Sequence, residues 1–325
     1  MLRRLILAAA CGLGLAAPAT AQTPQDCPRG ALDARFCDRD GDLVADPPTD
    51  ARQQVDPAVL IFAYTPVEDP AVYRSVFEGF LAHLSRLTGK RTQFFAVQNN
   101  AAQIEAMRAG RLHIAGFNTG GTPLAVNCAG FVPFAVMASN DGQFGYEMEV
   151  IVRADSPIQR MEDLRGRQLA FTSQTSNSGF RAPQVLLRDQ FNMLPDRDFR
   201  TAFSGSHQNS VIGVANRDYD AAAIANEVMA RMIARNVVRA DQFRTVFRSA
   251  TFPTTGYGLA HNLSPALQER IREAFFTYPW EGSSLAREFG SAVPPMQKFL
   301  PITYRQNWEV VRQVDAALGV QYRCQ

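Results

Sequence analysis

The chain has 325 residues, of which 46% are hydrophobic and 20% are charged, and its formal net charge is +2. This length allows one or two domains with large hydrophobic cores. The nearly balanced charge shows none of the basic excess of a nucleic-acid-binding protein, so we expect no nucleic-acid partner.

The N-terminus has the three parts of a secretory signal peptide. Two arginines precede an apolar run over residues 5–17, and Ala-Thr-Ala at 19–21 suits signal peptidase. We therefore expect removal of residues 1–21 and export to the periplasm. No later segment is apolar for about 18 residues, so we expect no membrane span in the mature chain. Lipidation at Cys11 is the alternative, although Ala8 stands where a large aliphatic residue is usual.

Residues 22–56 are polar, rich in Pro, Asp and Arg, and lack hydrophobic periodicity, so we expect an extension outside the main fold. Within it, four carboxylates occupy alternating positions of a short loop, which can turn them toward one cation. They belong to Asp38, Asp40, Asp42 and Asp46. Oxygen ligands suit calcium, and the spacing is similar to thrombospondin type 3 repeats. A solvated acidic loop is the alternative, because Leu43 stands where those repeats have a second glycine.

Four cysteines follow the expected signal peptide, and disulfides are permitted in an exported chain. Cys27 and Cys37 are close in the sequence, so we expect a local bridge between them. Cys128 and Cys324 can pair or stay free.

Strand-like and helix-like segments alternate after residue 57, which predicts parallel sheets covered by helices. The predicted strands lie at 58–63, 92–97, 112–116, 147–153, 168–172, 201–204, 221–224, 245–249 and 257–261. The predicted helices lie at 69–88, 101–109, 161–164, 178–190, 206–215, 228–235, 265–277 and 305–318. The order indicates one lobe from residues 57–150 and 255–325, and a second from 151–254.

The most informative segment follows the predicted strand 168–172. It reads Thr175, Ser176, Asn177, Ser178 and Gly179 at the start of a helix. Hydroxyl and amide side chains there cap the helix and add donors to its free N–H groups. Together with the helix dipole, they can form an anion site. Simple capping is the alternative.

A second segment of the same kind follows the next strand. Ser204-Gly205-Ser206 leads into His207 at the start of the next helix. The following strand ends at Glu227, at the same edge of the predicted sheet, where α/β proteins bind ligands. A lone histidine is more often structural, so the position of His207 beside the first segment is what favours a role in binding.

These motifs, with the later Val-Ala-Asn-Arg-Asp-Tyr-Asp-Ala-Ala at 214–222, resemble the phosphate/phosphite/phosphonate solute-binding proteins of ABC transporters. The resemblance runs from about Val59 to the C-terminus. It implies an α/β, two-lobed, hinged periplasmic binding fold of type II. It also implies a small oxyanion ligand in the cleft between the lobes and a transporter permease as partner.

The resemblance further implies the residues that would contact the ligand. They are Tyr64, Thr119, Thr122, Thr175, Ser176, Asn177, Ser178, His207 and Glu227. Two departures limit the choice of ligand. Thr255 stands where binders of amino-alkyl phosphonates have a second acid, and residues 116–123 carry small polar groups where the family usually has Gly-Pro and a Tyr. A cationic ligand tail is therefore not expected. Asn177, in place of the threonine of the usual Ser-Thr-Ser, is a smaller change.

A second function remains open at this point. A branch of the same fold resembles periplasmic arsenite sensors that signal to a histidine kinase through a thiol in the cleft. Cys128 lies shortly after the cleft segment 116–123 and is the candidate thiol, with a buried or disulfide-bonded cysteine as the alternative. None of the four histidines lies in a catalytic motif, so we expect no enzymatic activity.

Overall fold

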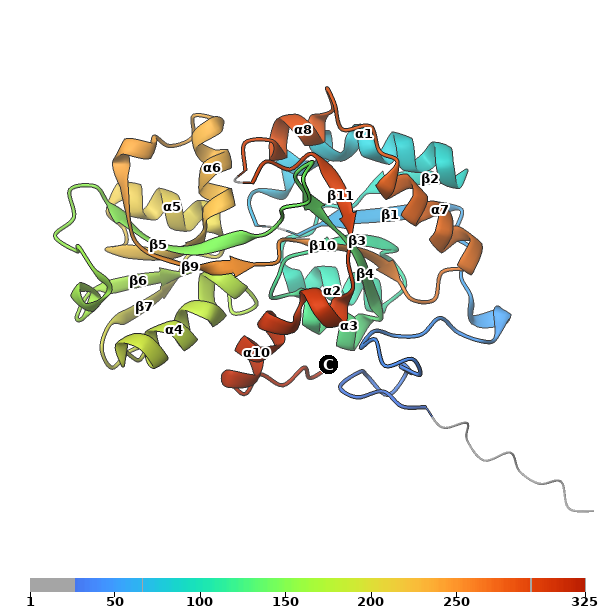
Figure 1. Cartoon of the computed structure of the whole chain (residues 1–325), viewed down its shortest axis with the longest axis horizontal. Coiled ribbons are helices and arrows are strands. Elements are labelled where there is room, and N and C mark those ends of the chain that lie inside the picture. Colours follow the sequence, from blue (N-terminus) through green and yellow to red (C-terminus); the bar gives the residue numbers. More distant parts are fainter. Residues whose placement is uncertain (1–26, 66, 293, 325) are drawn as a thin grey trace, which may run out of the picture.

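Eleven strands form two separate sheets in the computed structural model, which describes residues 27–65, 67–292 and 294–324. The expected signal peptide lies outside the described residues. Figure 1 shows the two sheets side by side, each with helices packed on it. We call the part with the six-stranded sheet lobe 1 and the part with the five-stranded sheet lobe 2.

Lobe 1 has a mixed sheet whose inner strands are buried. Its order is β11 (Lys298–Pro301), β4 (Phe131–Ala138), β10 (Gly256–Ala260), β3 (Ile114–Phe117), β1 (Val59–Tyr64) and β2 (Arg91–Phe94). β1 runs parallel to β2 and β3, whereas β10 is antiparallel to β3 and β4. Its helices are α1 (Pro70–Thr88), α2 (Asn100–Arg108), α3 (Thr122–Ala129), α7 (Pro265–Phe276), α8 (Ser284–Phe289), α9 (Tyr304–Asn307) and α10 (Glu309–Ala317).

Lobe 2 has its own sheet and hydrophobic core. The order is β7 (Arg200–Phe203), β6 (Gln168–Phe171), β8 (Ala221–Ala225), β5 (Tyr146–Arg153) and β9 (Phe243–Phe252). Its helices and helical turns are η2 (Met161–Leu164), η3 (Asn177–Arg181), α4 (Ala182–Phe191), α5 (His207–Asn216), α6 (Asn226–Ala234) and η4 (Ala240–Gln242). β6 is parallel to β7 and β8, so the helices that follow these three strands all begin at one edge of the sheet.

Local sequence signals explain where the helices begin and end. In α1, Asp69 accepts a hydrogen bond from Ala71 N–H, Pro70 occupies the first turn, and Gly89 ends the helix at φ +68°. This combination of an acidic cap, an early proline and a left-handed glycine is favourable at helix ends. The predicted helix 69–88 therefore agrees closely with α1.

The sequence predictions missed several elements of lobe 1. β4 is buried along almost its whole length and contains Pro133, so it shows no alternation of apolar and polar residues. β11 has four residues and ends in a proline. Because β4, β10 and β11 join as antiparallel strands, the sheet is mixed rather than parallel. β5 begins at Tyr146, so the expected division at residue 150 falls inside a strand of lobe 2.

The expectation that the N-terminal extension lies outside the fold is wrong. Leu32, Phe36, Val44 and Ala45 are buried and belong to the hydrophobic core of lobe 1. The extension forms a short 3-10 turn, η1 (Ala51–Gln53), before it enters β1. Its few apolar residues do not form a periodic pattern, but each fills a gap on the surface of lobe 1.

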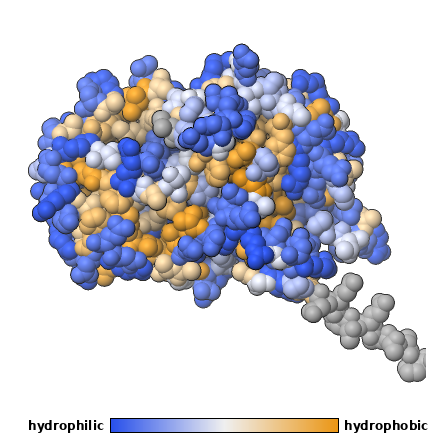
Figure 2. Space-filling model, in the orientation of Figure 1, coloured by the Kyte–Doolittle hydropathy of each residue, from blue (hydrophilic) through white to orange (hydrophobic). Residues whose placement is uncertain are grey.

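Two disulfides lie near the two ends of the described chain. Cys27 bonds to Cys37, as expected, and Cys128 at the end of α3 bonds to Cys324 near the C-terminus. Among the described helices, none is long and apolar enough to cross a membrane. Hydrophilic residues predominate on the face drawn in Figure 2, with apolar residues scattered between them on both lobes.

The two disulfides differ greatly in the length of chain that they close, with separations of 196 and 10 residues. Loop-closure entropy rises with that length, so we expect Cys128→Ser/Cys324→Ser to lower the free energy of unfolding by about 2–5 kcal/mol. Cys27→Ser/Cys37→Ser is the matched control and should cost less. Denaturant unfolding of both variants checks this, and an equal or reversed order would contradict it.

Candidate functional site

A small enclosed cavity lies between the two lobes, at the sheet edge where η3, α5 and α6 begin. Its volume is about 20 Å³, enough for about one water molecule in this closed arrangement. It is lined by Val67, Asn118, Thr119, Tyr146, Ser176, Asn177, Ser178, His207, Ala225, Glu227, Val228 and Thr255. Both predicted polar segments of lobe 2 therefore meet in one place.

Ser176 is at the centre of the donor side of this cavity. It caps η3, and its Oγ accepts a hydrogen bond from Gly179 N–H at 3.0 Å. Ser176, Asn177 and Ser178 are all at most 4% exposed. Because η3 continues into α4, the first N–H groups and the positive end of the helix dipole point toward the same space.

The neighbouring His207 has a defined protonation pattern. Its Nδ1 accepts a hydrogen bond from Ala225 N–H at 3.0 Å, so the ring proton is on Nε2. Nε2 lies 3.3 Å from Ser176 Oγ. Burial, together with the positive charge of Arg231, lowers the pKa of His207 to about 4. At neutral pH His207 is thus a neutral donor, and the Ser176 hydroxyl proton stays available for a ligand.

Lobe 1 supplies the opposite wall through the loop between β3 and α3. Thr119 lines the cavity, but its hydroxyl donates to Pro253 O at 2.7 Å, and Trp308 Nε1 donates to Thr119 O at 2.9 Å. Asn118 Oδ1 accepts from Gly121 N–H at 2.7 Å in the turn that precedes α3. These bonds hold the loop rigidly against the segment that connects β9 to β10.

Two acceptor groups also face the cavity. Asn177 Nδ2 donates to the Tyr146 hydroxyl at 3.1 Å, while the buried Asn177 Oδ1 has no hydrogen-bond partner. Glu227 is the one charged residue in the lining given above. Burial raises its pKa, and the nearby Arg231 opposes this shift. The cavity therefore combines several neutral donors with an amide oxygen and a carboxyl group.

A buried ion-pair cluster joins the lobes next to the cavity. Arg231 of α6 donates to Glu68 of lobe 1 through Nε at 3.1 Å and Nη2 at 3.0 Å. Arg235 also binds Glu68, and Glu288 of α8 lies 3.5 Å from Arg235. Burial alone would raise the pKa of Glu68, but Arg231 and Arg235 hold it below its usual value. The cluster holds the lobes together.

A second set of contacts joins the lobes at the other end of η3. Arg181 Nη1 donates to Gly120 O at 3.0 Å and to both carboxylate oxygens of Asp315 at 2.9 Å. The Tyr322 hydroxyl donates to the same carboxylate at 2.8 Å. Asn100 Nδ2 of lobe 1 donates to Thr175 Oγ1 at 2.9 Å. These contacts occupy Arg181 at the junction of the two lobes.

Three of the predicted ligand residues do not line the cavity. Tyr64 is 4% exposed and packs against Tyr73, whose ring centre lies 4.5 Å away. Thr122 is fully buried and donates to Asn118 O at the start of α3. Thr175 lines a neighbouring cavity of about 320 Å³ and contacts Asn100 across the lobes.

The sequence analysis did not identify some of the residues that line the cavity. Tyr146 begins β5, and Thr255 was noted only as the replacement of an acid. Burial raises the pKa of Tyr146, so its phenol keeps the proton and remains a donor. The spacing of Glu227 and Arg231, one helical turn apart on α6, was a usable signal for the charge cluster, whereas Glu68 had none.

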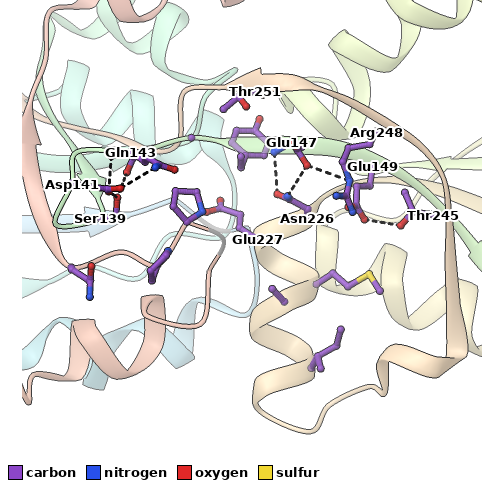
Figure 3. A pocket seen from close by; sticks show the side chains of 18 of the residues that line it. Ser139, Asp141, Gln143, Glu147, Glu149, Asn226, Glu227, Thr245, Arg248 and Thr251 are labelled. Carbon is purple, nitrogen blue, oxygen red and sulfur yellow. Dashed lines mark hydrogen bonds and ion pairs between the residues drawn. The ribbon is translucent and has the colours of Figure 1, made fainter.

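A larger cavity of about 950 Å³ adjoins the small one, and Tyr146 and Glu227 belong to both linings. In it, Arg248 lies 3.3 Å from Glu147 and 2.6 Å from Glu149. Figure 3 shows this network beside Glu227. The small cavity therefore adjoins a larger space that is lined mainly by polar residues.

Cys128, the candidate thiol of the sensor alternative, is not a free thiol in the structure. Its sulfur is bonded to that of Cys324, and it does not belong to the cavity lining. A disulfide sulfur cannot supply the thiolate that a soft oxyanion centre would need. The sensor alternative therefore loses the residue on which it depended.

The sequence is similar to a family model and to known proteins. A family model described as the periplasmic substrate-binding protein of phosphonate ABC transporters matches residues 62–305. The phosphate-import protein PhnD of Mycolicibacterium smegmatis is 26% identical over 241 residues, which cover 71% of this chain and 75% of that protein. The phosphonates-binding periplasmic protein of Escherichia coli is 25% identical, over 61% of this chain and 60% of that protein.

Solved structures agree with the two-lobed arrangement. A binding protein component of an ABC phosphonate transporter from Pseudomonas aeruginosa has a TM-score of 0.71 at 25% identity, covering 80% of this chain and 86% of that one. PhnD1 of Prochlorococcus marinus, solved with methylphosphonate, has a TM-score of 0.70 at 15% identity, covering 82% and 100%. The expected two-lobed periplasmic binding fold is confirmed.

The buried histidine makes a prediction about pH. In the unfolded chain His207 takes up a proton below its ordinary pKa of 6.5, whereas the folded chain keeps it neutral to about pH 4. The unfolded state binds more protons in this interval, so the His207 contribution is complete above pH 6.5 and decreases as the pH falls. We expect a loss of about 3 kcal/mol of unfolding free energy by pH 4.

Comparison with His207→Gln isolates this contribution, because the other three histidines remain. Denaturant unfolding of both proteins between pH 7 and 4 is the measurement. The difference in unfolding free energy between them should shrink as the pH falls, and parallel profiles would show that His207 is not held neutral.

Proposed function

The chain belongs to the family of periplasmic substrate-binding proteins of phosphonate ABC transporters, and we propose that its cleft binds a small phosphorus oxyanion. Phosphate, phosphite and simple phosphonates are the ligand class. The observation that carries the proposal is the convergence of Ser176, Ser178 and His207 at the start of η3. Ser176 and Ser178 are neutral, buried hydroxyl donors, and His207 Nε2–H donates to Ser176 Oγ, which leaves the Ser176 proton free for a ligand. Such donors bind an oxyanion without a fixed counter-ion.

The acceptors in the lining support a choice among oxyanions. Asn177 Oδ1 has no partner, and Glu227 brings a carboxyl group to the same cavity. An oxyanion that carries a proton can donate to these oxygens, whereas one without a proton would face lone-pair repulsion. We propose that the site prefers protonated oxyanions such as hydrogen phosphate over sulfate, which has no proton at neutral pH.

Transport follows from closure of the lobes around the ligand. Ser176, Ser178 and His207 belong to lobe 2, whereas Asn118 and Thr119 belong to lobe 1, so a ligand between them favours the closed arrangement. The family supports a periplasmic location and a transporter permease that recognises the closed form. The binding role, rather than catalysis, is the part of this proposal that family membership supports directly.

Calorimetry with phosphate, phosphite, methylphosphonate and sulfate tests the ligand class. We expect at least one phosphorus oxyanion to bind, with sulfate at least about 10-fold weaker, because one repelled hydrogen-bond contact costs about 1.5 kcal/mol or more. Glu227→Gln should reduce the difference in affinity between the phosphorus oxyanion and sulfate, since an amide can donate a hydrogen bond where the carboxylate cannot. No binding by any phosphorus oxyanion would refute the proposed function.

Ser178→Ala tests the donor side, and removal of a hydrogen bond to a charged ligand should weaken binding by about 10- to 100-fold. Ser283→Ala is the matched control, because Ser283 caps α8 in the way that Ser176 caps η3 but lies outside the cavity. The control should keep the affinity of the unchanged protein. Equal affinities for all three proteins would remove Ser178 from the site.

Gly120 tests closure separately from ligand contacts. A Cβ at this position would lie 2.4 Å from Thr175 O and 2.7 Å from Asn177 N of the other lobe. Gly120→Ala should therefore weaken the binding of every ligand. The affinity should fall by about 10-fold or more if the substitution raises the free energy of the closed arrangement by about 1.4 kcal/mol. Gly79→Ala in α1 is the control, because its added methyl would meet the end of the Tyr278 side chain at 3.3 Å. Unchanged binding by Gly120→Ala would show that the bound form is more open.

A further inference from the structure

Three carboxylates gather in the N-terminal extension, far in the fold from the anion cleft. One oxygen from each of Asp38, Asp40 and Asp42 lies within 4.8 Å of the others. Asp46, the fourth predicted ligand, is outside this group, because its Oδ2 accepts from Arg39 N–H at 3.0 Å and pairs with Arg39 Nη1 at 3.1 Å.

Each of the three carboxylates uses one oxygen to shape the loop and keeps the other. Asp38 Oδ2 accepts from Leu43 N–H, Asp40 Oδ1 from Asp42 N–H, and Asp42 Oδ1 from Val44 N–H, at 3.0–3.2 Å. Gly41 and Leu43 both adopt positive φ, at +73° and +71°. This turn brings three carboxylate groups together, and among the described residues no basic side chain forms an ion pair with any of them.

Asp38 supplies the observation that separates this loop from an ordinary acidic surface. The residue is 8% exposed, and its Oδ1 is buried without a hydrogen-bond partner in the part of the chain that the structure describes. A buried carboxylate oxygen without a partner is costly, so such oxygens are normally paired, protonated or bound to an ion.

We propose that Asp38, Asp40 and Asp42 bind one calcium ion. Two oxygens on opposite sides of a Ca²⁺ ion are about 4.6–5.2 Å apart, so the observed spacing allows all three to reach one ion with small adjustments. The ligands are hard oxygens on an irregular loop, which Ca²⁺ tolerates, whereas Mg²⁺ requires a near-octahedral arrangement at shorter distances. Backbone carbonyls and water complete the shell.

The position of the loop gives the ion a structural role. Cys37, which precedes Asp38, is held by the disulfide to Cys27, and Arg305 of α9 donates to Gly41 O at 3.0 Å. The next residues, Val44 and Ala45, are buried in the core of lobe 1. Figure 1 shows this segment beside the C-terminal end of the chain. Calcium would fix the extension on lobe 1 without taking part in anion binding.

Calorimetric titration of the EDTA-treated, dialysed protein with CaCl₂ tests the proposal, with MgCl₂ as the comparison. We expect one site with a Kd of about 0.1–1 mM or tighter for Ca²⁺ and weaker binding of Mg²⁺. Saturating Ca²⁺ should raise the Tm by about 2–4 °C and slow proteolysis of the extension, because the ion binds only the folded loop.

Asp40→Asn is the diagnostic variant, because Asp40 is exposed and removal of its charge leaves the buried Asp38 in place. It should weaken Ca²⁺ binding at least about 10-fold and abolish the Tm shift. Asp50→Asn, in the same extension but outside the cluster, should respond to Ca²⁺ like the unchanged protein. Absence of a heat signal and of a Tm shift at about 5 mM Ca²⁺ would overturn the proposal, as would equal Ca²⁺ responses of both variants.

Discussion

The buried ion pair between Arg231 and Glu68 is the constraint on which the closed site depends. It joins α6 of lobe 2 to the loop that follows β1 in lobe 1, and both side chains are at most 1% exposed. Loss of one partner would leave a buried charge uncompensated, which typically costs about 3–5 kcal/mol. The pair therefore favours the relative position of the lobes in which the cavity forms.

Charged residues have different roles in the ion pair between Arg231 and Glu68 and in the oxyanion site beside it. The ion pairs hold the lobes together, while the oxyanion site beside them is built from hydroxyls, an amide and the neutral His207. Arg231 helps to keep His207 neutral through its own positive charge. The basic residues are thus occupied by structural carboxylates, and recognition of the anion falls to oriented dipoles, which discriminate by geometry and protonation.

Close approach of backbones completes the closure. Gly120 of lobe 1 lies against Thr175 O and Asn177 N of lobe 2, where a side chain would not fit. Arg181 reaches across the same contact to Gly120 O and Asp315, and the bond between Cys128 and Cys324 anchors the segment that follows Asp315. The C-terminal segment therefore contacts the last residue of η3, Arg181.

The sequence alone indicated helix starts near Ser176 and His207 and the order of most strands, because caps, periodicity and chain order are local properties. It also indicated Glu227 correctly as a residue at the cleft edge. Only the tertiary structure decided that Tyr64 and Thr122 are buried outside the cavity lining, and that Cys128 forms a disulfide with Cys324. The pairing of Arg231 with Glu68 likewise joins residues 163 positions apart. Such contacts depend on how two separate sheets pack, and no local pattern records that packing.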